Sequence, residues 1–168
     1  DGLGRKPGRA HDEGGLVTEI SGWGRHPRVE ALETRDEDLE RAGREGALFR
    51  GLGRSYGDAS LPARSGARVV STVRADRLIS FDPATGVLHA EAGLSLADLN
   101  RSFLPRGFAP PVVPGTQFVT LGGMVACDVH GKNHHAEGTF GRHVRGLRMR
   151  VPDGRVLEIS EASEPELF

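Results

Sequence analysis

Short apolar stretches rich in Val, Ile, Leu and Ala recur along the chain, and most of them are bounded by glycine, proline or aspartate. Stretches of this length and composition are typical of buried β-strands. Two of the intervening turns, Asp82–Gly86 and Pro152–Gly154, have the composition of hairpin turns. The pattern therefore predicts strands at residues 47–50, 67–73, 78–81, 87–92, 144–151 and 156–159.

Other segments carry helical signals. Residues 96–104 place their leucines and Phe103 on one face, and Ser95 precedes them as an N-cap. Acidic residues followed by arginines predict a helix at about residues 37–44, capped by Thr34 or Asp36. A third helix is expected to begin near Thr120 or Gly122 and to end before Gly131. Helices interspersed with strands predict the α/β (α+β) fold class.

The chain of 168 residues is long enough for one domain, or for part of a larger one. Residues 1–15 are polar and glycine-rich, so we expect a disordered tail there and a folded domain over residues 16–168. The formal net charge of −1 gives no electrostatic reason to expect nucleic acid as a partner. No apolar run approaches the ~18 residues of a membrane-spanning helix, so no transmembrane segment is expected.

Two glycine-rich segments carry the strongest candidate chemistry. The first, residues 50–58, reads Arg-Gly-Leu-Gly-Arg-Ser-Tyr-Gly-Asp, and the second, residues 114–135, places Gly122-Gly123 at the start of the third predicted helix. Glycine lets backbone N–H groups approach an anion, and a helix N-terminus adds free N–H groups. Either segment alone also fits a turn or a helix contact without any ligand. Two such segments in one domain favour a diphosphate held from both sides, and a flavin dinucleotide is the natural candidate.

The second segment also contains a cysteine, an aspartate and three histidines, at Cys127, Asp128, His130, His134 and His135. These residue types can bind zinc, but their spacing matches none of the strong zinc signatures, so we expect no metal. Of the 22 basic residues only Lys6 and Lys132 are lysines. A cation at Lys132 could hold a substrate phosphate or stabilise an anionic reduced flavin, and a lysine placed there by chance is the alternative.

With these motifs the chain resembles the FAD-binding domain of the vanillyl-alcohol-oxidase-type (PCMH-type) FAD-linked oxidoreductases. The resemblance rests on residues 50–58, on Pro-Gly-Thr at 114–116 and on residues 122–135, and it runs from about Gly22 to Phe168. It implies a two-subdomain FAD-binding domain that is incomplete at its C-terminus and that, in the family, precedes a separate substrate domain. We therefore expect that the chain alone is not an active oxidase.

The His-Gly-Lys-Asn-His-His sequence at residues 130–135 resembles in particular the branch that oxidises the 2'-hydroxyl of decaprenylphosphoryl-ribose to a ketone in arabinan and cell-wall precursor synthesis. This implies noncovalent FAD, a lipid-linked sugar substrate, a partner reductase as one option for the electron acceptor, and a cytoplasmic or peripherally membrane-associated location. It also implies catalytic roles for Lys132, near the substrate, and for His130, against the flavin ring. The alternatives are a noncatalytic flavin- or nucleotide-binding module and a metal-dependent hydrolase built on the histidines.

The motifs and the resemblance together imply a set of cofactor-binding residues. These are Arg50, Gly51, Leu52, Gly53, Arg54, Ser55, Tyr56, Gly57, Asp58, Gly115, Thr116, Thr120, Leu121, Gly122, Gly123, Cys127, Asp128 and His130.

Overall fold

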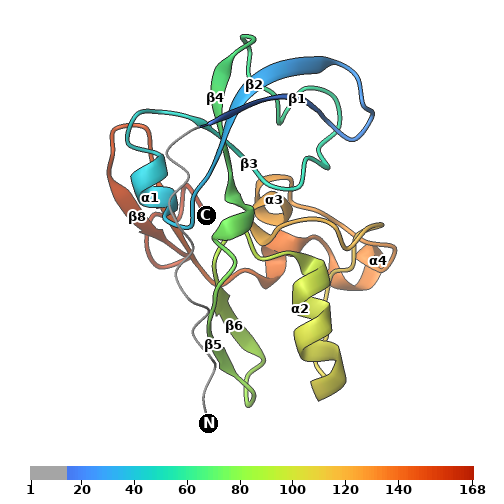
Figure 1. Ribbon diagram of the computed structural model, residues 1–168. Coiled ribbons are helices and arrows are strands. Elements are labelled where there is room, and N and C mark those ends of the chain that lie inside the picture. Colours follow the sequence, from blue (N-terminus) through green and yellow to red (C-terminus); the bar gives the residue numbers. More distant parts are fainter. Residues whose placement is uncertain (1–14) are drawn as a thin grey trace.

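A computed structural model describes residues 15–168 of the chain. Its largest sheet has four strands in the order β1 (Leu16–Ser21), β2 (Arg28–Arg35), β4 (Ala67–Ser71) and β3 (Leu48–Arg50) (Figure 1). β1 is antiparallel to β2, whereas β4 is parallel to both β2 and β3. The predicted disordered tail, residues 1–15, lies outside the described residues except for Gly15.

The sequence does not predict β1 or β2, and the reason is their surface position. Leu16 and Val17 in β1 are 71% and 66% exposed, while Ile20 is buried. In β2 only Ala31 is fully buried among alternating charged residues, so the apolar signal of a strand is weak. Arg28 of β2 instead forms an ion pair with Glu19 of β1 at 2.8 Å.

The predicted helix at residues 37–44 is present but shorter. The helix α1 spans Leu39–Ala42 and is capped by Asp38, whose side chain accepts a hydrogen bond from the N–H of Arg41. The predicted caps, Thr34 and Asp36, are therefore wrong. Asp36 instead accepts a hydrogen bond from the N–H of Asp38 at 2.9 Å, which shapes the turn before the helix.

The rest of the described chain contains the other helices and two hairpins. The hairpins are β5 (Leu78–Asp82) with β6 (Val87–Ala90), and β7 (Leu147–Arg150) with β8 (Val156–Ile159). The helices are α2 (Leu96–Phe103), α3 (Leu121–Ala126) and α4 (His134–Glu137), with 3₁₀ turns at Thr72–Arg74, Leu104–Arg106 and Phe140–His143. The predicted hairpins, the Ser95 cap of α2 and the Thr120 start of α3 are confirmed, whereas α4 is not predicted.

Two separate hydrophobic clusters hold these parts together. One lies on the four-stranded sheet and contains Ile20, Ala31, Leu61 and Val69. The other joins α2 and α3 to the β5–β6 hairpin through Leu96, Leu99, Phe103 and Met124, and the rings of Phe81 and Phe103 lie 4.6 Å apart. In Figure 1 the sheet lies above α3, and the β5–β6 hairpin lies beside α2 below it. The mixed fold class is therefore confirmed.

Candidate functional site

A cleft of about 2480 Å³ is lined by both glycine-rich segments and by residues of the cluster around α2. The first segment contributes Arg50 through Tyr56, and the second contributes Pro114–Thr116, Val119–Gly123, Cys127 and His130. The volume exceeds the 300–1,000 Å³ of ordinary small-molecule pockets. The cleft can therefore accommodate an extended ligand such as a dinucleotide.

The turn after β3 contains a run of backbone N–H groups without acceptors in the described part of the chain. The N–H groups of residues 52–57 donate to no acceptor within residues 15–168. Gly53 and Gly57 have φ angles of +67° and +59°, which glycine adopts without steric cost. The turn is fixed from outside, because the N–H of Trp23 donates to the Ser55 carbonyl at 2.9 Å. This combination is typical of a backbone anion site.

Two arginines add positive charge to this turn. Arg50 donates through Nη2 to the Ser21 carbonyl, while its Nε atom is buried without a partner within the described residues. Burial lowers the pKa of the Arg50 guanidinium; Glu33 opposes this effect, and the charge of Arg54 adds to it. The Arg54 guanidinium lies 5.5 Å from the centre of the Trp23 ring. The site is therefore cationic and has an unsatisfied buried donor.

The two glycine-rich segments meet at Gly51 and Thr120. A Cβ atom on Gly51 would collide with the Thr120 hydroxyl oxygen, so no larger residue fits at this position without a shift. Thr120 is 3% exposed, and its hydroxyl also accepts a hydrogen bond from the N–H of Gly123 at 3.2 Å. One buried side chain thus caps α3 and contacts the first turn.

The free N–H groups expected at the start of α3 are not present. The N–H of Leu121 donates to Leu94, that of Gly122 donates to Ala92, and that of Gly123 donates to Thr120. Gly122 is instead a packing residue, because a Cβ there would lie 3.0 Å from the Ala92 methyl carbon. Just before the helix, the backbone N–H groups of four residues have no acceptor among the described residues: Gly115, Thr116, Gln117 and Val119. The cap at Thr120 was predictable from the sequence and accounts for the Gly123 N–H, whereas the acceptors of Leu121 and Gly122 come from a different segment.

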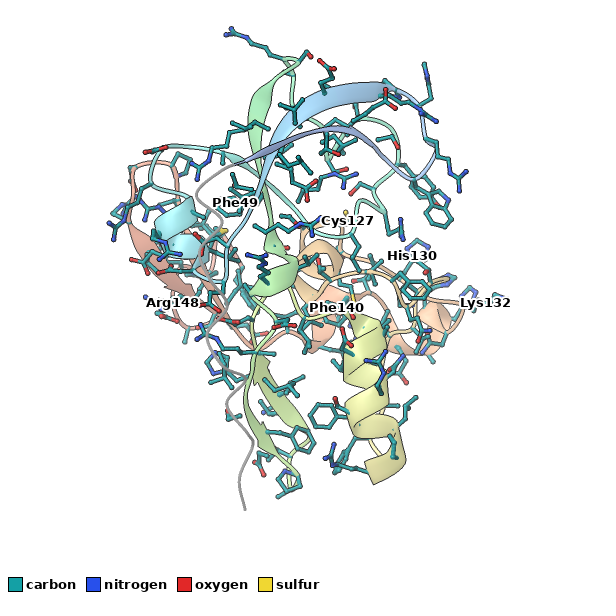
Figure 2. All side chains as sticks on the ribbon, viewed as in Figure 1. Phe49, Cys127, His130, Lys132, Phe140 and Arg148 are labelled. Carbon is teal, nitrogen blue, oxygen red and sulfur yellow. The ribbon has the colours of Figure 1, made fainter. Side chains whose placement is uncertain are left out.

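The segment after α3 brings only some of the predicted residues to the cleft. Cys127 and His130 are exposed and line it, and Figure 2 shows them near the middle of the molecule. Lys132 is exposed but does not line the cleft, and Figure 2 shows it near the outer edge beside α4. Gly57, Asp58 and Asp128 also lie outside the lining.

The histidines contact one another and the backbone. The His130 and His134 rings meet edge to face with centroids 5.7 Å apart, and the His134 and His135 centroids are 3.9 Å apart. His134 Nδ1 lies 3.2 Å from the Gly131 carbonyl oxygen. Within residues 15–168, no group of three or more His, Cys, Asp or Glu side chains is arranged to hold a metal ion.

A further wall of the cleft was not predicted. Phe140, Arg142, His143 and Arg145 line it from the segment between α4 and β7, and Phe49 lines it from β3. Figure 2 shows Phe140 below Cys127. No sequence motif marks these residues, because their position depends on how the chain returns after α4.

Comparisons with known proteins agree with this geometry. Residues 40–160 match the sequence family described as FAD binding domain. The chain is 40% identical over 161 residues to a decaprenylphosphoryl-beta-D-ribose oxidase of Mycolicibacterium smegmatis, covering 89% of this chain and 34% of that protein. It is 29% identical over 112 residues to a D-lactate dehydrogenase of Archaeoglobus fulgidus, covering 67% of this chain and 25% of the relative.

The fold is similar to that of a solved structure. The BBE-like 1 protein of Physcomitrella patens superposes with a TM-score of 0.74 at 18% identity, over 87% of this chain and 34% of that one. At this identity the likeness shows the fold alone. The chain spans about a quarter to a third of the length of these proteins. None of the helices within residues 15–168 has both the length and the apolar character needed to cross a membrane.

Proposed function

Because the chain belongs to the FAD-binding domain family, we propose that it binds FAD noncovalently in the cleft, with the diphosphate at the turn of residues 51–57. The observation that carries this placement is the run of N–H groups at residues 52–57 without acceptors among the described residues. Arg50 and Arg54 both line the cleft and supply positive charge for phosphate oxygens. Gly115 and Thr116 offer N–H groups from the second segment.

The flavin ring is proposed to lie against Cys127 and His130. Both residues line the same cleft as the first turn, and the contact between Gly51 and Thr120 joins the two segments. Phe140, half-buried on the neighbouring wall, adds an apolar surface for a planar ring. The chain thus has a polar, cationic region for the diphosphate and a mixed aromatic region for the ring system.

For the whole protein we propose oxidation of a hydroxyl group on a lipid-linked sugar, with decaprenylphosphoryl-ribose as the model substrate. The 40% identity to a decaprenylphosphoryl-beta-D-ribose oxidase supports this substrate class. FAD, when bound, supplies a hydride acceptor for the carbon that carries the hydroxyl. We propose that His130 orients the ring or the substrate, and that the Lys132 ammonium attracts the substrate phosphate at the outer end of the site. A reductase is the proposed partner for reoxidation, and a cytoplasmic or membrane-peripheral location fits such a substrate.

The test uses the 168-residue chain and its full-length parent protein. The chain should retain flavin that acid releases, and the full-length protein should lose its flavin absorbance when decaprenylphosphoryl-ribose is added without oxygen. Flavin binding without reduction by the sugar lipid would refute the substrate class and leave the binding site intact. A chain that binds no flavin, alone or at full length, would refute the site itself.

A noncatalytic flavin-binding module is the second candidate. It is favoured by the position of Lys132, which is exposed and outside the cleft lining. In that case the full-length protein would bind flavin, and neither the wild type nor Lys132→Ala would show substrate-dependent reduction of it.

A further inference from the structure

The segment that carries Cys127 and His130 to the cleft is short and leaves the end of α3 directly. Its path is fixed by a neighbouring segment at residues 139–141. The N–H of Phe140 donates to the Val129 carbonyl at 2.8 Å, and His130 and Thr139 form an isolated antiparallel bridge. The orientation of His130 therefore depends on how firmly these two segments are held together.

Asp128 is the side chain that connects them. Its Oδ1 atom accepts a hydrogen bond from the N–H of Gly141 at 2.8 Å. Asp128 has a φ of +39°, in the left-handed region where Asn and Asp are the most common non-glycine residues. A Cβ on Gly141 would lie 2.9 Å from this carboxylate oxygen, so no larger residue fits at position 141 without a shift of the Asp128 side chain. Asp128 itself does not line the cleft.

Both segments joined by Asp128 contribute to the cleft wall. Cys127 and His130 lie on one, whereas Phe140, Arg142 and His143 lie on the other. We propose that Asp128 is a positioning residue that sets the spacing of these two segments, and thereby the orientation of His130 and Cys127 toward the flavin. It acts through the Gly141 N–H and does not contact the ligand. The inference rests on the proposed function, because it takes the flavin to occupy this cleft.

Substitutions at Asp128 can separate the role of its acceptor oxygen from its tolerance for positive φ. Asn keeps an acceptor oxygen and the tolerance for positive φ, Gly keeps only the tolerance for positive φ, and Ala keeps neither. Asp153→Ala is a matched control, because Asp153 Oδ1 accepts a hydrogen bond from the Arg155 N–H at 3.0 Å in the β7–β8 turn, outside the cleft lining. The control removes the same kind of turn bond at a distant position in the sequence.

The first measurement is the amide hydrogen-exchange rate of Phe140 and Gly141 in the chain without cofactor. These N–H groups donate to the Val129 carbonyl and to Asp128 Oδ1, so their exchange reports directly on the contact between the two segments. Asp128→Gly and Asp128→Ala should raise the Phe140 exchange rate about threefold or more, because local opening is no longer opposed. Asp128→Asn and Asp153→Ala should stay within about twofold of the wild type, since both retain this contact.

The second measurement is FAD affinity together with the visible absorbance spectrum of the bound flavin. Asp128→Gly should weaken affinity about threefold or more, because only part of the population then holds His130 and Cys127 in the binding position, and should shift the flavin bands, while Asp128→Asn restores both. A wild-type exchange rate and a wild-type flavin spectrum in Asp128→Gly would overturn the proposal. A changed exchange rate with an unchanged spectrum and affinity would overturn it as well. Absence of FAD binding by the wild-type chain would instead refute the proposed function, and the exchange rates would still decide whether Asp128 holds the segment.

Discussion

Alanine substitutions at Gly53 and Gly57 should separate the cost of backbone strain from the loss of the Arg50 contact. Both glycines have positive φ, +67° and +59°, so alanine pays a similar conformational penalty of about 1–2 kcal/mol at either position. A Cβ on Gly57 would meet no atom within 4 Å, whereas a Cβ on Gly53 would collide with the Arg50 guanidinium. Arg50 would have to move and give up its bond to the Ser21 carbonyl, which adds about 1 kcal/mol for this half-buried group.

We therefore expect Gly53→Ala to lower the free energy of unfolding by about 2–3 kcal/mol and Gly57→Ala by about 1–2 kcal/mol. The assay is urea unfolding followed by far-ultraviolet circular dichroism, with FAD titration of the same samples. FAD affinity should fall about tenfold or more in Gly53→Ala, because a displaced Arg50 no longer faces the diphosphate, and about threefold or less in Gly57→Ala. Equal losses of stability and affinity in the two variants would refute the role given to Arg50.

Three further predictions concern other parts of the site and the fold. Thr120→Val should lower the free energy of unfolding by about 1–2 kcal/mol in urea unfolding, through loss of the α3 cap. Thr120→Ser keeps the cap and should lose about 0.8 kcal/mol for its buried methyl group; a larger loss in Thr120→Ser than in Thr120→Val would contradict the capping role. Lys132→Ala in the full-length protein should leave flavin content unchanged and reduce turnover about tenfold or more, and wild-type turnover would leave Lys132 as a surface residue. The pKa of Asp82 is held below its ordinary value of 3.8 by the Thr85 hydroxyl and the Ala84 N–H. The resulting stabilisation of the folded state is present above pH 3.8 and is lost as the pH falls through the lowered pKa. Asp82→Asn should therefore flatten the decline in the free energy of unfolding measured from about pH 5 to about pH 3. An unchanged decline would show that Asp82 does not contribute to it.

The parts of the fold that the sequence predicts are those with strong local signals. The Ser95 cap, the apolar face of α2 and the Pro152–Gly154 turn all specify their elements without help from distant residues. β1 and β2 lack such signals, because β1 is an edge strand with exposed apolar residues and β2 has charged residues at half of its positions. Their pairing with β4 depends on contacts between residues far apart in the sequence.

The candidate site shows the same division. Glycine content marks the turn at residues 51–57, and the structure leaves its N–H groups without acceptors among the described residues. The sequence cannot show that the start of α3 is already satisfied, because the acceptors at Leu94 and Ala92 come from a different segment. It also cannot place Lys132, whose exposure outside the cleft lining follows from the path of the loop before α4.

Because Trp23 contacts the first glycine-rich turn, its fluorescence can report on ligand binding there without an added label. Trp23 is the single tryptophan, Tyr56 is the single tyrosine, and both line the cleft at this turn. The indole is half-exposed, it carries the Arg54 guanidinium 5.5 Å from its ring centre, and its backbone is tied to Ser55. Indole emission overlaps flavin absorption, so energy transfer from Trp23 would report occupancy of the cleft in unlabelled wild-type protein. The intrinsic fluorescence of the chain therefore reports on the turn at residues 51–57, where the FAD diphosphate is proposed to bind.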